Sequence, residues 1–124
     1  MKDKIIPDKY RGSIEYDKVK AELINAAKYQ GLITYQDIAA IMGLDSKGSV
    51  MGSRTGYMLG EISEDEVLAG RPMLSALAVS VEGKPGPGFA GLCVDLGLIN
   101  KGQDWEPFWQ QQRKKVYKTW APRH

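Results

Sequence analysis

Glycine and proline interrupt this chain at short intervals, and this punctuation limits its possible folds more than any other feature. Breaks fall at Gly12, Gly31, Gly43 and Gly70-Arg71-Pro72. Glycine commonly ends helices because it adopts the left-handed conformation, as expected at Gly31, and proline disfavours helix in the residue before it. The segments between the breaks are short, and a two-turn helix is not stable alone. They must pack together, which predicts one domain over residues 1–124.

Apolar residues at helical spacing predict four main helices. Residues 1–12 form an N-terminal arm, and Ser13 then caps a helix whose apolar face is Tyr16, Val19, Leu23, Ala26 and Ala27. Thr34 caps a short helix that ends at Gly43, with Asp37 completing a capping box. A third helix covers about residues 50–67, and the last covers about residues 106–120 within a C-terminal segment, 105–124.

The segment Met73–Val81 carries no charge and predicts a well-covered strand. A loop rich in glycine and proline follows at 82–88, then a short apolar helix at about 89–98. The strand's expected partner is either Leu32-Ile33 or part of the loop. The predicted fold class is therefore α+β, a mainly helical winged-helix-like domain with a small antiparallel sheet.

Charge is nearly balanced, with a net charge of +2, but it is unevenly distributed. Basic residues gather near both ends, and would form one basic face if the termini meet: Lys2, Lys4, Lys9, Arg11, Arg113, Lys114, Lys115, Lys118 and Arg123. The acidic residues Glu61, Glu64, Asp65 and Glu66 are expected on an exposed helix end.

The sequence offers few groups for catalysis. The only histidine is the last residue, His124, and the only cysteine, Cys93, lies in an apolar context typical of a buried structural thiol. We therefore predict no catalytic site, no metal site and no cofactor. A metal-dependent nuclease using Asp37, Glu61 and Asp95 stays as an alternative that their spacing does not support. Without an N-terminal apolar segment, a cytoplasmic location is expected.

The clearest functional pattern is a helix-turn-helix, with helices at 34–43 and 50–62 joined by a turn at 44–49. In such units the second helix enters the major groove of DNA. Residues 31–89 then comprise the helix-turn-helix, the strand and a wing. The predicted DNA contacts carry groups that reach phosphates and base edges: Thr34, Tyr35, Ser53, Arg54, Tyr57 and Lys84.

Four glycines four residues apart, Gly48, Gly52, Gly56 and Gly60, would share one face if this stretch is helical. Glycine inside a helix costs about 1 kcal/mol relative to alanine, so a close neighbour is expected there. The preferred neighbour is another helix or the strand. A nucleic-acid backbone or a small ligand is the alternative neighbour. If residues 45–53 instead form a loop, the glycines do not share a face. The loop 83–88 is a plain connection, an anion cradle or the tip of a wing.

Three tryptophans, Trp105, Trp109 and Trp120, belong to the last helix. Their spacing favours packing on the core. If they are exposed, they would instead anchor a protein partner or a homo-oligomer, because aromatic residues dominate interfaces. A protein–protein interaction module, using this helix or the glycine face, is therefore the alternative to DNA binding.

Residues 31–89 resemble the C-terminal DNA-binding domain of alkylguanine-DNA alkyltransferases and alkyltransferase-like proteins. The similarity lies in Thr34-Tyr35-Gln36-Asp37-Ile38-Ala39 and in Arg54-Thr55-Gly56. It implies that Arg54 fills the space of a flipped base and that Tyr35 contacts the DNA backbone. The family's reactive Pro-Cys-His-Arg motif falls on Leu74-Ser75-Ala76-Leu77, so the resemblance implies DNA binding without alkyl transfer. The chain also resembles small proteins of bacteria and mobile elements, a likeness that implies no activity.

Overall fold

The computed structural model describes residues 4–45 and 49–122. Predictions that concern Lys2, Gly48, Arg123 and His124 therefore lie outside the described residues, as do residues 46–48 of the expected turn before the third helix. The described chain is mostly helical. Its elements are α1 (Ile14–Lys28), β1 (Ile33–Thr34), α2 (Tyr35–Ile41), α3 (Ser49–Leu68), the 3-10 helix η1 (Leu74–Leu77), β2 (Ala78–Val79), α4 (Gly88–Asp95) and α5 (Trp105–Thr119).

The predicted starts of α1 and α2 are confirmed. Local hydrogen bonds determine both starts. Ser13 caps α1, with its side chain accepting from the Tyr16 N–H at 3.1 Å. Thr34 and Asp37 form the predicted capping box at the start of α2. One helix end differs. The residue with a left-handed backbone after α1 is Gln30, at φ 55°, and not Gly31.

The expected strand over Met73–Val81 is wrong in most of its length. Residues 74–77 form η1, and only Ala78–Val79 is a strand. All residues from Met73 to Val79 are buried. A fully buried segment is apolar on every side whether it is helical or extended, so its hydrophobic pattern does not distinguish the two.

The sheet is parallel, so the predicted antiparallel sheet is also wrong. β1 pairs with β2, with Ile33 opposite Ala78 and Thr34 opposite Val79. The predicted partner strand, Leu32-Ile33, is therefore one residue away from the observed one, Ile33–Thr34. The connection between the strands contains α2 and α3, and a long helical crossover is what parallel strands require. The loop after β2 closes through the Ser80 N–H and the Lys84 carbonyl at 2.8 Å. No further strand follows within the described chain, so the expected wing has no hairpin there.

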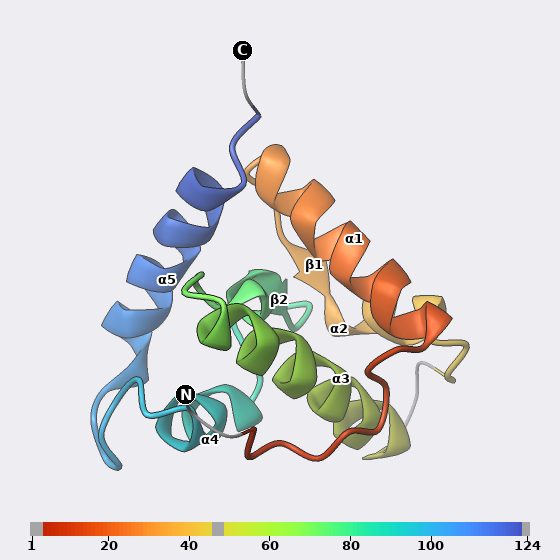
Figure 1. Ribbon diagram of the computed structural model, residues 1–124, viewed down its shortest axis with the longest axis horizontal. Helices are drawn as coiled ribbons and strands as arrows, with labels where there is room; N and C mark the ends of the chain where they lie inside the picture. The colour runs from red at the N-terminus through yellow and green to blue at the C-terminus, as the bar shows by residue number, and fades with distance from the viewer. Residues whose placement is uncertain (1–3, 46–48, 123–124) are drawn as a thin grey trace.

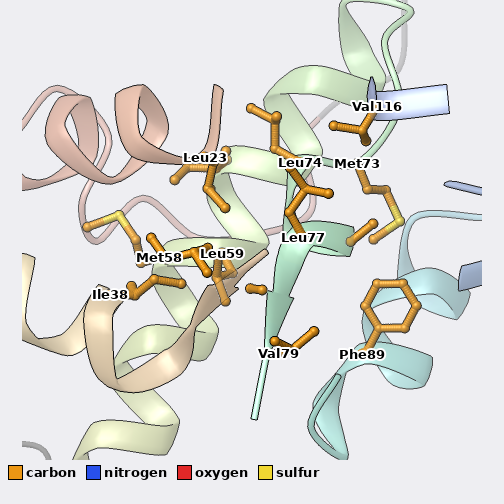
Figure 2. Packing of buried hydrophobic residues seen from close by; sticks show 14 of the residues in the cluster. Leu23, Ile38, Met58, Leu59, Met73, Leu74, Leu77, Val79, Phe89 and Val116 are labelled. Atoms are coloured by element: carbon orange, nitrogen blue, oxygen red, sulfur yellow. The ribbon is translucent and has the colours of Figure 1, made fainter. Parts of the chain in front are cut away.

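The core lies where η1 and β2 pass through the centre of the molecule, with α1, α3 and α5 around them (Figure 1). Figure 2 shows Leu23 of α1, Met58 and Leu59 of α3 and Val116 of α5 converging on Leu74 and Leu77. Five of these six side chains are less than 2% exposed, and Leu59 is 5% exposed. No helix of the described residues is long and apolar enough to cross a membrane.

Residues 4–12, the described part of the N-terminal arm, have no regular secondary structure, as expected, but they are not detached from the helices. This segment runs past α4 and α3 before it joins α1 (Figure 1). Ile6 packs on α3 beside Gly60. The described part of the arm therefore packs against α3.

Candidate nucleic-acid interface and adjoining cavity

The first half of α3 presents three polar side chains to solvent. Ser53, Arg54 and Tyr57 are all exposed, and their spacing of three and four residues places them on one side of the helix. Among the described residues, Arg54 has no acidic partner within 4 Å. Tyr57 is 46% exposed, and the Lys9 Nζ lies 4.7 Å from the centre of its ring. The structure therefore brings together half of the predicted contact residues.

Thr34 and Tyr35 use their hydroxyl groups inside the protein. The Thr34 Oγ1 accepts from the Asp37 N–H at 3.1 Å in the capping box. The half-buried Tyr35 hydroxyl accepts from the Gly86 N–H at 2.5 Å. Burial raises the pKa of the Tyr35 phenol, and the bond from Gly86 opposes this shift only in part. Tyr35 therefore keeps its own proton to donate.

Lys84 lies on the turn after β2 and is 61% exposed. Its Nζ lies 3.5 Å from the carboxylate of Glu106, at the start of α5. Because that carboxylate partly offsets its charge, Lys84 offers an anion less attraction than Arg54 does.

The glycine series is helical in its described part but does not have the close neighbours we expected. A Cβ atom added at Gly52 or Gly56 would meet no atom within 4 Å apart from the helix's own backbone. The expectation that another helix or strand approaches them is therefore wrong. Only Gly60 is covered, by Ile6 of the arm at 3.4 Å and Leu92 of α4 at 3.7 Å from such a Cβ.

The two open glycines border a cavity of about 290 Å³. The polar groups of its wall come from Tyr35, Thr55 and Ser75, and its other residues are mainly apolar or glycine: Gly52, Gly56, Leu59, Gly86, Pro87, Gly88, Phe89 and Leu92. The loop 83–88 thus closes one side of this cavity. Ser75 belongs to the buried η1, and its hydroxyl pairs with the Ser63 hydroxyl at 2.6 Å.

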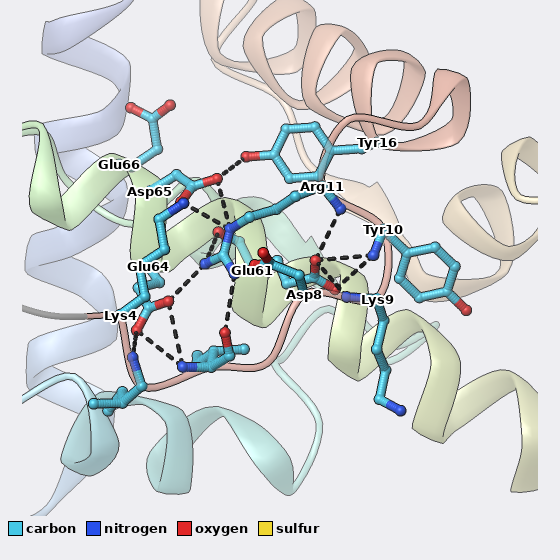
Figure 3. Close-up of polar contacts among 12 residues, drawn as sticks. Lys4, Asp8, Lys9, Tyr10, Arg11, Tyr16, Glu61, Glu64, Asp65 and Glu66 are labelled. Carbon is cyan, nitrogen blue, oxygen red and sulfur yellow. Dashed lines mark hydrogen bonds and ion pairs between the residues drawn. The ribbon is translucent and has the colours of Figure 1, made fainter.

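The acidic residues of α3 are not on an exposed helix end, so that expectation is wrong. Glu61, Glu64 and Glu66 are each 2% exposed or less. One Glu61 oxygen accepts from three successive N–H groups of the arm, those of Lys9, Tyr10 and Arg11, at 2.9–3.0 Å (Figure 3). These bonds replace the water that a carboxylate loses on burial.

Glu64 and Asp65 bind the same arm through Arg11. The Arg11 Nη2 lies 2.6 Å from Glu64, and its Nε lies 3.0 Å from Asp65 (Figure 3). Glu64 also accepts from the Ile5 and Ile6 N–H groups. Although burial alone would lower the pKa of Arg11, its acidic partners raise it above the ordinary value. Arg11 is therefore firmly charged within this cluster.

Glu66 has a separate set of partners. It pairs with Arg71, and its other oxygen lies 3.2 Å from the Lys20 Nζ. For the other three acidic residues, the sequence did hold a signal that they act together, because residues 61, 64 and 65 share one side of a helix. What the sequence lacked was any sign that residues 4–12 lie against that side.

The groups considered for other activities are the Cys93 thiol and the carboxylates of Asp37, Glu61 and Asp95. Cys93 is fully buried, as predicted, and burial raises the pKa of its thiol to about 12. Within the described residues, no three His, Cys, Asp or Glu side chains form a group able to hold a metal ion, so Asp37, Glu61 and Asp95 are not assembled.

None of the three tryptophans is exposed, which leaves the last helix little aromatic surface for a partner. Trp109 is 3% exposed and donates to the Ala76 carbonyl at 2.8 Å. Trp105 lies beside it at 6.2 Å between ring centres, and Trp120 is covered in part by Arg71. These contacts agree with the prediction that the tryptophans pack on the core.

No family model, no curated protein and no solved structure matches the chain.

Proposed function

We propose that this protein is a non-catalytic DNA-binding protein of the helix-turn-helix type, with α3 as its recognition helix. The observation that carries the proposal is the exposed Arg54 side chain, which has no acidic partner among the described residues and stands beside Ser53 and Tyr57. An unpaired guanidinium is suited to bind phosphate or a guanine edge.

The order of elements supports the same function. The seven-residue α2 directly precedes and packs on α3, as the first helix of a helix-turn-helix does. The resemblance to the alkyltransferase DNA-binding domain covers the same elements. Because its reactive motif falls on the buried η1 residues Leu74–Leu77, the proposal is limited to binding.

The proposal is tested by fluorescence anisotropy of a labelled DNA duplex titrated with the protein at low and moderate salt. We expect binding that weakens log-linearly with salt, since phosphate contacts release counterions. Arg54→Ala is expected to cost about 1–3 kcal/mol of binding free energy. Lys28→Ala is the matched control, because it removes one exposed charge at the far end of α1.

Two results would count against the proposal in different ways. If the protein fails to bind duplex even at low salt, DNA binding is wrong. If Arg54→Ala binds as tightly as Lys28→Ala, α3 is not the recognition helix, although another surface still binds DNA. Where Arg54→Ala does weaken binding, Arg54→Lys separates charge from shape, because lysine keeps the charge and loses the two-pronged geometry.

A further inference from the structure

Lys9 differs from the other basic residues in the described part of the arm. Arg11 is held by Asp8, Glu64 and Asp65, and the Lys4 Nζ lies 4.0 Å from Asp65. Among the described residues, Lys9 has no acidic side chain within 4 Å of its ammonium group. Acidic side chains therefore pair with Lys4 and Arg11, while the Lys9 ammonium group has no such partner in the described part of the chain.

The backbone of Lys9 is held firmly even though its side chain is exposed. Its N–H group donates to Glu61 at 3.0 Å, and those of Tyr10 and Arg11 donate to the same oxygen at 2.9 Å. Glu61 is 0% exposed, so these bonds are shielded from water. Shielded charge-assisted hydrogen bonds are stronger than exposed ones, so the arm is anchored at this point.

The side chain of Lys9 extends from this anchor away from the acidic cluster (Figure 3). Its Nζ lies 4.7 Å from the ring centre of Tyr57. A cation over an aromatic face is attracted by the ring, which limits where the ammonium group moves. Because Tyr57 lies three residues after Arg54, on the same side of α3, Lys9 joins the same exposed face.

We propose that Lys9 is a phosphate-binding residue of the DNA interface, and that Glu61 is the positioning residue that holds it there. This inference rests on the proposed function. The arm lies across α3 and adds the Lys9 cation to the face that carries Arg54, although the two residues are more than forty positions apart in the chain. Phosphate is the expected ligand because an ammonium group is a point charge without the fork needed to read a base edge.

The test measures duplex binding of Lys9→Met across a range of salt concentrations. Methionine keeps most of the apolar stem over Tyr57 and removes the charge. We expect severalfold weaker binding at low salt, equal loss on duplexes of different sequence, and a salt slope reduced by about 1. Lys9→Arg should restore the slope. Lys28→Met, the matched control, should change neither quantity.

A double-mutant cycle tests the role of Glu61. Glu61→Gln keeps the shape but removes the charge that the three N–H groups bind, so it should weaken DNA binding in the wild-type background. In the Lys9→Met background it should weaken binding little further, because Glu61 acts through Lys9. Circular dichroism at each step confirms that the variants are folded.

The possible failures are distinguishable. If the wild-type protein does not bind duplex, the proposed function fails and this inference fails with it. If the wild type binds and Lys9→Met matches it in affinity and salt slope, DNA binding stands and the role of Lys9 is wrong. Equal effects of Glu61→Gln in both backgrounds would overturn the positioning role alone.

Discussion

At the scale of single residues, the buried carboxylates of α3 show how an expensive group becomes a structural one. Burying an ionised carboxylate is unfavourable unless hydrogen bonds replace its water. Glu61 receives its replacement from three backbone N–H groups, and Glu64 from two such groups and Arg11. Residues that look like a solvated surface in the sequence therefore connect the arm to α3.

The glycines of α3 give a prediction at this scale. Gly56→Ala should raise the free energy of unfolding by about 1 kcal/mol, because alanine favours helix and its Cβ meets no neighbour. Gly60→Ala is the matched variant in the same helix. Its gain should be smaller, since Ile6 lies 3.4 Å from the new Cβ and must shift. Urea denaturation measures both, and equal gains would show that Ile6 does not pack on Gly60 in solution.

At the scale of elements, the arm and α3 form one unit despite their separation in the chain. Figure 3 shows Arg11 reaching into the acidic side of α3, where its side chain is 9% exposed. The Tyr16 hydroxyl of α1 also donates to Asp65. The arm, the start of α1 and the second half of α3 therefore share a single polar cluster.

Removing the arginine from this cluster should be strongly destabilising. Arg11→Gln leaves the buried carboxylate of Glu64 without its cation. Loss of one partner of a buried ion pair costs about 3–5 kcal/mol, and urea denaturation should show a loss of this size. Lys28→Gln, at an exposed position, should change stability by no more than about 0.5 kcal/mol. If the two variants are equally stable, the cluster contributes little to folding.

At the scale of the whole molecule, buried phenols link stability to alkaline pH. Burial, with a smaller contribution from Asp65, raises the pKa of Tyr16 above its ordinary value of 10.0, and burial also raises the pKa of Tyr35. The folded protein thus holds these protons more tightly than the unfolded chain does. Their stabilising effect is fully present below pH 10 and is lost as pH rises above it.

We therefore expect the free energy of unfolding to fall as pH is raised from about 9 to about 11, and Tyr16→Phe to make that fall shallower. Urea denaturation at each pH gives the profile, and phenolate absorbance reports the titration directly. A wild-type profile that stays level across this range would show that Tyr16 is not buried against Asp65.

Much of the helical structure was predictable because its signals are local. The caps at Ser13 and Thr34 are decided by residues three positions away, and the buried face of α1 follows from helical spacing. Of the proposed interface, Ser53, Arg54 and Tyr57 could be placed together on this basis. Thr34 and Tyr35 were also predicted as DNA contacts. The Thr34 hydroxyl is occupied by the local cap, whereas the hydrogen bond of Tyr35 with Gly86 depends on the complete fold.

The sequence by itself determined where the helices begin, which faces of them are apolar and that Cys93 is buried, because each depends on near neighbours. Only the tertiary structure decided that residues 74–77 form a 3-10 helix and residues 78–79 pair in parallel with β1. It also decided that Glu61 and Glu64 are buried and that Lys9 meets Tyr57. Each of these depends on contacts between segments far apart in the chain. Such contacts form only when the segments pack. The local sequence of a carboxylate or of a buried apolar segment does not show which distant segment it will contact.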